Sequence, residues 1–266
     1  MPPPSIKDIR FIPTALLEQY KLQIASDVQQ NFENLRDSDL SIDTFSFYTS
    51  VSAVFSSKIE GEEMELDSYI KHKRLGGHFS ADYTRKTDDL YAAYVYAQQN
   101  KLGSENLFES HKLITKNILQ PSRQGEIRAG NMFVLTDDGR IEYVAAEPRI
   151  VKRELDCLLT DIDTLLVSEL HFNEVLFFSS MIHLLFVKIH PFEDGNGRTA
   201  RLLEKWFIAQ KLGAKAWFIQ SEKNYYNQHQ NYYKNLRALG LEYDSLDYNK
   251  ALPFLLMLPQ SIITQP

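Results

Sequence analysis

The stretch HPFEDGNGRTAR, residues 190–201, carries most of the information in this chain. It directly follows an apolar run, residues 172–189, that reads as a helix. The stretch 190–201 places an imidazole, a carboxylate, two glycines and two arginines within a few bonds of one another. Such a combination can hold the phosphates of a nucleotide and bring a hydroxyl group to them.

His190 precedes a proline, and a residue in that position is pushed out of the α region. The helix predicted over residues 172–189 should therefore end at His190, with the imidazole projecting into the loop. An ordinary pKa near ~6.5 leaves much of this side chain neutral at cellular pH. His190 is thus a candidate general base.

The two glycines of the stretch indicate an anion site. Gly195 and Gly197 carry no side chain and allow positive φ, so backbone N–H groups can converge there. A helix is expected to begin at about Arg198, and its N-terminus adds free N–H donors and a partial charge of about +0.5. Arg198 and Arg201 are three residues apart, share a helix face, and can each grip a phosphate through two hydrogen bonds.

Asp194 supplies a hard oxygen of the kind that binds Mg²⁺ together with substrate phosphates. An EF-hand interpretation fails, because its first ligand position would fall on Phe192 and its twelfth on Leu203. Phe192 is instead expected to be a buried anchor. A capped turn with solvated arginines is the plainer interpretation of each element alone, but the combination favours a phosphate site.

Bulk composition narrows the class of protein. The chain has 266 residues with 44% hydrophobic and 24% charged, and its net charge of -6 argues against binding a nucleic-acid backbone. The single Cys157 cannot form an internal disulfide and is expected to be a small buried side chain. Polar residues interrupt the apolar run at 172–189, which favours a core helix over a membrane span. We therefore expect a cytoplasmic protein without nucleic-acid or membrane partners.

Hydrophobic periodicity predicts a mostly helical chain. After a first helix over residues 14–36, a second helix should follow, capped by Ser41 and ended by Gly61. The predicted helices are 14–36, 41–60, 66–74, 84–100, 107–119, 148–167, 172–189, 198–212 and parts of 221–239 and 251–258. Strand-like residues 132–135 and 141–144 flank a glycine-containing turn at 137–139 and predict one β-hairpin.

The stretch 190–201 resembles the signature of Fic-domain proteins, His-x-Phe-x-(Asp/Glu)-Gly-Asn-Gly-Arg-x-x-Arg. All eight fixed positions are met, at His190, Phe192, Asp194, Gly195, Asn196, Gly197, Arg198 and Arg201. The resemblance covers about residues 45–239. It implies an all-α fold, a Fic-like helical bundle with one small β-hairpin flap. We divide the chain into an N-terminal helical region (1–100), a Fic core (101–240) and a C-terminal helical extension packed on the core (241–266).

Such proteins typically transfer AMP from ATP to a Ser, Thr or Tyr hydroxyl of a protein, and pyrophosphate leaves. By this resemblance His190 would deprotonate the hydroxyl, and Asp194 would hold the Mg²⁺ that bridges the α- and β-phosphates. The anion cup would be lined by Gly195, Asn196 and Gly197. Arg198 would contact the β-phosphate and Arg201 the γ-phosphate.

Residues 56–61, SSKIEG, resemble the inhibitory motif of the same family, (Ser/Thr)-x-x-x-Glu-(Gly/Asn). Ser56 and Glu60 are four residues apart and share a helix face. Glu60 falls in the last turn, where a carboxylate opposes the helix dipole and gains from a cationic partner. If that partner is Arg201, the γ-phosphate loses its arginine. The alternative is a surface glutamate in a rim ion pair, worth about 0–1 kcal/mol.

Three further expectations concern the surroundings of the site. The hairpin resembles the family's flap, which pairs with the target as an added strand; an ordinary surface hairpin is the alternative. Tyr233 matches a residue that stacks on adenine in relatives, although Gly240 stands where some of them carry an amide side chain. His111 and His183 are expected to be satisfied core histidines.

The sequence therefore predicts an autoinhibited protein adenylyltransferase that uses ATP and Mg²⁺, acts on a protein target, and can modify itself or form oligomers. Two alternatives stay open: hydrolytic removal of AMP at the same site, with Glu60 positioning water, and a nucleotide-sensing interaction protein with little turnover. UTP in place of ATP is also open.

Overall fold

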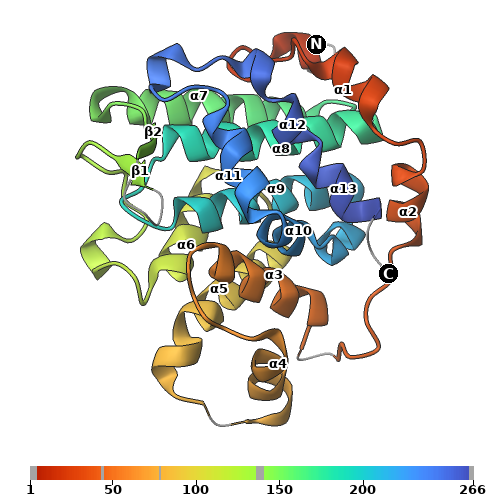
Figure 1. Cartoon of the computed structure of the whole chain (residues 1–266), viewed down its shortest axis with the longest axis vertical. Coiled ribbons are helices and arrows are strands. Elements are labelled where there is room, and N and C mark those ends of the chain that lie inside the picture. The colour runs from red at the N-terminus through yellow and green to blue at the C-terminus, as the bar shows by residue number, and fades with distance from the viewer. Residues whose placement is uncertain (1–4, 43–44, 78, 136–140, 264–266) are drawn as a thin grey trace.

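A computed structural model describes residues 5–42, 45–77, 79–135 and 141–263, and helices dominate it (Figure 1). Its α-helices are α1 (Leu17–Gln23), α2 (Val28–Asn34), α3 (Phe47–Ile59), α4 (Leu66–Leu75), α5 (Ala81–Gln99), α6 (Ser104–Thr115), α7 (Pro148–Val167), α8 (Phe172–Ile189), α9 (Asn196–Leu212), α10 (Ser221–Asn227), α11 (His229–Arg237), α12 (Leu252–Leu255) and α13 (Met257–Ile263). The two strands are β1 (Phe133–Leu135) and β2 (Ile141–Val144). The predicted class, all-α with one small hairpin, is confirmed.

Helix α8 forms the centre of the molecule, and α9 packs along it. Nearly every side chain of α8 is buried, including Phe177, Leu184 and Phe186. Among the described residues it is the one helix long and apolar enough to cross a membrane, yet 89% of it is buried inside the fold. A core helix of a soluble protein has the same property. Because α8 and α9 are joined by residues 190–195, the core fixes the loop that carries the motif.

Helix α7 illustrates how local sequence sets the elements. Pro148 stands in its first turn, where a missing N–H is tolerated. Val151, Leu155 and Leu158 recur at helical spacing and are fully buried against the core. Cys157 lies on the opposite side and is exposed, so the expectation of a buried thiol is wrong. The helical period that buries its neighbours turns this residue outward.

Strands β1 and β2 pair antiparallel, with Phe133 opposite Val144 and Val134 opposite Tyr143. This confirms the predicted hairpin; its turn, residues 136–140, lies outside the described residues. Val144 N donates to Leu241 O at 2.8 Å, so the chain after α11 lies along the outer edge of β2. In Figure 1 the hairpin stands at one side of the bundle, and the Tyr143 hydroxyl on β2 donates to Val187 O near the end of α8.

Two predicted boundaries differ in the N-terminal region. The expected helix 14–36 is split into α1 and α2, because residues 24–27 leave the helix. Ser26 and Asp27 compete with a helix for backbone hydrogen bonds, and the bend lets α1 pack on α8 while α2 packs on α13. The helix expected from Ser41 begins only at Phe47.

Ser46, not Ser41, caps α3: its hydroxyl accepts from Thr49 N at 3.2 Å. Ser41 still accepts from Phe47 N, at 3.1 Å, while Ile42 and Phe45 exchange two backbone hydrogen bonds in an isolated bridge and so do not join the helix. The helix therefore starts five residues later than its first good capping residue suggests.

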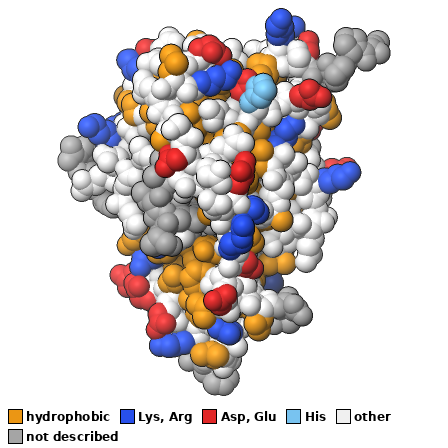
Figure 2. Space-filling view, turned by 90° about the vertical axis from the view of Figure 1, so that its right-hand side faces the viewer, with side chains coloured by type: hydrophobic (Ala, Val, Ile, Leu, Met, Phe, Trp, Pro, Cys, Tyr) orange, Lys and Arg blue, Asp and Glu red, His pale blue; other side chains and the backbone are white. Residues whose placement is uncertain are grey.

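One hydrophobic core runs through all three proposed parts of the chain and includes Tyr20, Leu184 and Leu258. The division at residues 100 and 240 stays a prediction. On the face shown in Figure 2, acidic and basic side chains are interspersed, and hydrophobic side chains gather in its lower half.

Candidate active site

The catalytic candidate His190 caps the end of α8 in an unusual backbone conformation. Its φ of 53° and ψ of 62° are left-handed, and among the described residues it is the one non-glycine with positive φ. Its N–H still donates to Phe186 O at 2.9 Å. The helix ends where Pro191 predicted, but through a left-handed residue rather than an extended one. Such a conformation is strained for a side chain other than glycine and needs support from its surroundings.

The Nδ1 atom of His190 has two oxygen neighbours. Val187 O lies 3.3 Å away, and the hydroxyl of Tyr143, on β2, lies 3.5 Å away. The same hydroxyl donates to Val187 O at 2.9 Å, so toward the imidazole it can only accept. Both neighbours therefore require the ring proton on Nδ1. This leaves the lone pair on Nε2, the atom that a general base would use.

The charge state of His190 follows from its environment. Burial lowers the pKa of this imidazole to about 4; the carbonyl of Val187, Glu60 and Asp194 act in the opposite direction, and Arg128 adds to the lowering. The side chain is therefore neutral near pH 7. A neutral imidazole with a free Nε2 can accept a proton from a hydroxyl group.

The two glycines of the motif serve different purposes. Gly195 has a φ of 78°, and an added Cβ would lie 2.7 Å from Thr115 Cγ2, so both conformation and space demand glycine. Gly197 does not need positive φ, because α9 begins at Asn196, two residues earlier than predicted. Its requirement is space: an added Cβ would overlap Glu60 Oε1. The first turn of α9 thus offers an open surface of backbone.

The loop between α8 and α9 is held by buried contacts. Asn196 is buried; its side chain accepts from Phe192 N and donates to Phe192 O, both at 2.9 Å. Its side-chain amide group is therefore committed to holding the loop. Phe192 is the predicted buried anchor, and the ring of His111 stacks on it at 3.6 Å.

Both expected core histidines are satisfied. His111 Nε2 lies 2.9 Å from Asp194 O, and its Nδ1 accepts from Gly125 N at 2.9 Å. His183 bridges Glu204, at 2.8 Å, and Tyr232, at 3.0 Å. His111 also holds the backbone of the motif from α6, a contact that no sequence pattern predicts.

Asp194 and Arg198 form the outer side of the site. Asp194 Oδ1 accepts from Gly195 N at 2.5 Å and lies 3.3 Å from Arg198 Nη2, while the side chain is 49% exposed. The described residues contain no cluster of three or more carboxylate, histidine or cysteine side chains able to hold a metal. One accessible carboxylate beside a helix N-terminus fits Mg²⁺, which takes its remaining oxygens from phosphates and water.

Arg201 is fully buried, and it binds two residues at the end of α3, Ser56 and the C-cap residue Glu60. Its Nε donates to Ser56 Oγ at 2.8 Å, and its Nη2 donates to Ser56 O at 3.1 Å and to Glu60 Oε1 at 2.6 Å. The predicted meeting of Ser56, Glu60 and Arg201 is present. Glu60 follows the last residue of α3, and Gly61, with a φ of 85°, lets the chain turn away.

Electrostatics favours the charged form of this pair. Burial would raise the pKa of Glu60, but Arg201 and Arg198 outweigh it and lower the pKa. Burial likewise works against the charge of Arg201, and Glu60 more than compensates, which raises its pKa. The Glu60 side chain is 24% exposed, so this ion pair sits at the mouth of the site.

Tyr233, on α11, lies within electrostatic reach of the same pair. Burial and then the Glu60 carboxylate raise its pKa. Its ring packs edge-on against His229 at 4.8 Å and Tyr232 at 5.2 Å. A role in stacking on adenine stays a prediction.

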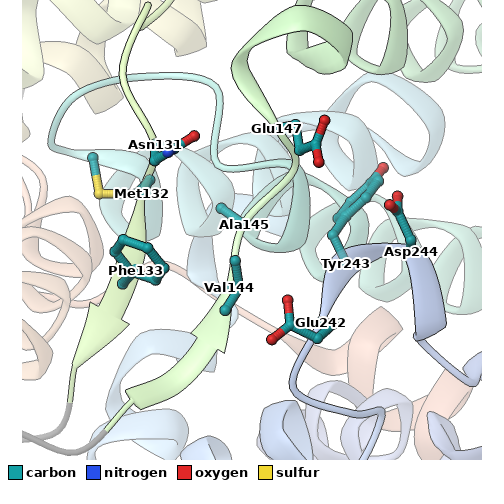
Figure 3. A pocket seen from close by; sticks show the side chains of 9 residues that line it. All are labelled: Asn131, Met132, Phe133, Val144, Ala145, Glu147, Glu242, Tyr243 and Asp244. Carbon is teal, nitrogen blue, oxygen red and sulfur yellow. The ribbon is translucent and has the colours of Figure 1, made fainter.

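A pocket of about 210 Å³ opens beside the hairpin rather than at the motif (Figure 3). It is lined by Asn131, Met132, Phe133, Val144, Ala145, Glu147, Glu242, Tyr243 and Asp244. None of these residues belongs to the stretch 190–201. Phe133 and Leu135 on β1 are half exposed, as a strand that receives a partner would be.

Comparison with known proteins agrees with this geometry. Residues 101–208 match the model of the Fic/DOC family. This segment includes α6, the hairpin, α7, α8 and most of α9. The chain therefore carries a Fic domain, with further helices on either side of it.

Among curated proteins, the chain is similar to protein adenylyltransferase fic-1 of Caenorhabditis elegans, with 29% identity over 117 residues. The aligned stretch is 43% of this chain and 20% of that relative, so the chain covers a fifth of the relative's length.

Solved structures share the fold. A Fic family protein from Desulfovibrio desulfuricans G20 has a TM-score of 0.67 at 19% identity, over 94% of this chain and 70% of that one. A Fic domain containing signaling protein from Bacteroides thetaiotaomicron VPI-5482 has a TM-score of 0.62 at 17% identity, over 94% and 93%. Fic-1 from C. elegans has a TM-score of 0.66 at 18% identity, over 94% and 71%.

Proposed function

We propose that this protein is an autoinhibited protein adenylyltransferase, which transfers AMP from ATP to a Ser, Thr or Tyr hydroxyl of a target protein. The Fic domain and the similarity to an adenylyltransferase support Fic-type adenylyl transfer. A target strand would pair with the hairpin beside His190. A cytoplasmic location, self-modification and a lack of nucleic-acid or membrane partners stay predictions from the sequence.

In the proposed reaction, Nε2 of His190 takes the proton of the incoming hydroxyl. The hydroxyl oxygen forms a bond to the α-phosphorus of ATP, the bond from that phosphorus to the bridging oxygen breaks, and pyrophosphate leaves. The neutral state of His190 and its Nδ1-protonated ring suit this step. Backbone N–H groups at the start of α9, together with Arg198 and Arg201, would hold the phosphates, because transfer of this kind depends on positioning and neutralised charge.

Mg²⁺ would be held by Asp194 and would supply positive charge that neutralises the phosphates of ATP. The exposed carboxylate next to Arg198 is the feature of this chain that fits the ion. Arg198 Nη2 at 3.3 Å keeps the carboxylate oriented toward the first turn of α9.

The single observation that carries the proposal is the position of the Glu60 carboxylate. It lies 2.6 Å from Arg201 and against the bare Cα of Gly197, where an added Cβ would overlap it. An anion already occupies the cup, which supports both a phosphate site and a block on it. The block is an ion pair with a fully buried arginine, unlike the rim pair that was the alternative.

The proposal is tested by incubating purified protein with Mg²⁺ and ATP labelled on the α-phosphate, with cell lysate as a source of targets. We expect weak labelling by the wild type and much stronger labelling by Glu60→Gly. Adding His190→Ala to Glu60→Gly should abolish labelling while calorimetry still detects ATP binding. Failure of Glu60→Gly both to bind ATP and to label any protein would refute the proposal.

A second function shares the site and has one observation in its favour. The Glu60 carboxylate acts electrostatically on His190, so a carboxylate that could orient a water molecule lies in the same site as the candidate base. That arrangement would suit hydrolytic removal of AMP. Incubating an AMP-modified target with wild type and with Glu60→Ala separates the two: removal requires Glu60, whereas transfer improves without it.

A further inference from the structure

Arg128, between α6 and β1, is a buried arginine that belongs to none of the sequence motifs described above. Its side chain is 5% exposed, and every hydrogen bond of its guanidinium goes to a backbone carbonyl. In the described part of the chain no carboxylate lies within ion-pair distance of it. Burial accordingly lowers its pKa. A buried charge without a counter-ion is unfavourable unless its hydrogen bonds are complete.

The carbonyls that Arg128 holds come from three different segments. Nε donates to His190 O at 2.6 Å and Nη2 to Ile189 O at 3.3 Å, at the exit of α8. Nη1 donates to Gly130 O at 2.6 Å, just before β1, and Nη2 also donates to Ala146 O, just after β2. The rigid planar fork of a guanidinium is what allows one side chain to hold all three segments.

The backbone of Arg128 joins the same arrangement. Its N–H donates to Pro191 O at 2.9 Å, so both the main chain and the side chain of this residue grip the turn at His190. The carbonyl held by Nε belongs to the left-handed residue itself. A peptide in that conformation is strained and stays in place only when its neighbours over-determine it.

We propose that Arg128 is a positioning residue for the transfer reaction: its guanidinium joins both ends of the hairpin to the backbone of His190, so that the base and the strand that would align the target keep one fixed geometry. This rests on the proposed function of the site. Arg128 touches neither the reacting atoms nor the phosphate cup. Its effect passes through the peptide of His190 and through the hairpin.

If Arg128 only stabilised the fold, its removal would lower stability without changing the reaction of the folded protein. Lys211 is the matched control for such a role, because this cation also binds backbone carbonyls: its Nζ donates to those of Leu165, Leu166 and Ser168 at 2.6–3.0 Å, remote from the motif. Removing that cation should lower stability and leave the chemistry of the folded protein intact. Removing Arg128 should lower stability and also misplace the base.

The test compares Arg128→Met, Arg128→Lys and Lys211→Met, each in the Glu60→Gly background, by Tm, by ATP affinity from calorimetry, and by kcat and KM for labelling. We expect Arg128→Met to lower kcat about 100-fold, since a misplacement of about 1 Å can have that effect, with ATP affinity changed less than about threefold. Arg128→Lys, which keeps the charge but not the fork, should lie between. Lys211→Met should keep its kcat per folded molecule.

NMR of the His190 ring nitrogens supplies a readout that needs no transfer. We expect one Nδ1-protonated state in Glu60→Gly, and broadened or doubled signals in Arg128→Lys, which also serves if Arg128→Met fails to fold. A kcat for Arg128→Lys equal to that of the parent, with an unchanged His190 spectrum, would overturn the inference. Absence of any transfer by the parent Glu60→Gly would instead count against the proposed function.

Discussion

Glu60 Oε1 and Arg201 Nη2 lie 2.6 Å apart, across the space left open by Gly197. One residue comes from the end of α3 and the other from the second turn of α9, 141 positions later in the chain. The contact therefore makes the N-terminal helices part of the site. Under the proposed function, the arginine would be kept from a phosphate while the carboxylate is in place.

Ser56 should affect both the state in which Glu60 binds Arg201 and the state in which Arg201 is free to bind ATP. Ser56→Ala removes the acceptor of Arg201 Nε and leaves a buried donor unpaired, at about 1–3 kcal/mol. We expect labelling slightly above wild type but well below that of Glu60→Gly. In the Glu60→Gly background, calorimetry should show ATP bound several-fold more weakly. Ser57→Ala, a buried neighbour that bonds Thr87 instead, is the control; equal ATP affinity with and without Ser56 would contradict the role.

The pH dependence of transfer should reflect the depressed pKa of His190. With a pKa of about 4, far below the usual value near 6.5, the base stays neutral throughout the neutral range. The Glu60 carboxylate raises the pKa of His190, so removing it in Glu60→Gly should lower that pKa further. The labelling rate of Glu60→Gly should therefore be flat between about pH 6 and pH 8. A fall in the rate, measured at saturating ATP, with a midpoint near the ordinary value would disagree with the burial of this imidazole.

Tyr143 should control which ring nitrogen of His190 carries the proton. Tyr143→Phe keeps the ring but removes the hydroxyl that bonds Val187 O and lies near Nδ1. We expect kcat to fall up to about tenfold with KM for ATP unchanged, as for loss of a modest orienting hydrogen bond. Tyr69→Phe, another buried hydroxyl, which bonds Thr87 O, is the control. Identical steady-state kinetics for Tyr143→Phe and its parent would remove this role.

Asp194 should be needed for the metal-dependent step and not for folding. Its side chain is 49% exposed, so Asp194→Asn should leave Tm within about one degree of the parent. In Glu60→Gly, we expect the substitution to lower labelling at least tenfold and to raise the Mg²⁺ concentration required. A chelator should abolish labelling by the parent. Asp156→Asn, on the outside of α7, is the matched control; full activity of Asp194→Asn without added Mg²⁺ would be incompatible with the assignment.

Lys188 should make stability depend on pH. Its Nζ has no hydrogen-bond partner in the described part of the chain and lies 4.0 Å from the centre of the Tyr143 ring. Burial lowers its pKa from 10.5 to about 7. Between these values the unfolded chain binds more protons than the folded one, so stability should rise with pH from about 7 to 10.

Lys188→Met should reduce that rise and stabilise the protein by about 1–3 kcal/mol at pH 7, as replacing buried charges by apolar groups often does. Urea unfolding at several pH values measures both effects. Lys152→Met, at an exposed position, should leave the pH dependence unchanged. Parallel pH profiles for wild type and Lys188→Met would show that the cation is accommodated without strain.

Local sequence was sufficient for many elements, and its failures have physical causes. The bounds of α7 and α8 match the predicted ranges 148–167 and 172–189, because long apolar periodicity and Pro191 leave little choice. The break between α1 and α2 was missed, since tertiary packing on α8 and α13 decides whether a weak helix bends. The start of α9 at Asn196, two residues before the predicted Arg198, also differs, because Gly197 allows a positive φ but does not adopt one.

At the site, the sequence predicted which residues belong together and not what supports them. His190, Asp194, Arg198 and Arg201 lie within one short stretch, so spacing alone brings them together. Arg128 and His111 carry no local signal, because nothing in a neighbouring residue shows which distant carbonyl a side chain will meet.

The sequence by itself determined the composition of the cup: a helix exit at a proline, a glycine turn and arginines on one face follow from the covalent order of twelve residues. Only the tertiary structure decided which side chain occupies that cup and which side chain holds the candidate general base in position. Contacts between α3 and α9, and between Arg128, the hairpin and His190, join residues far apart in the chain. Their geometry is set by how the common core packs, which no local pattern specifies.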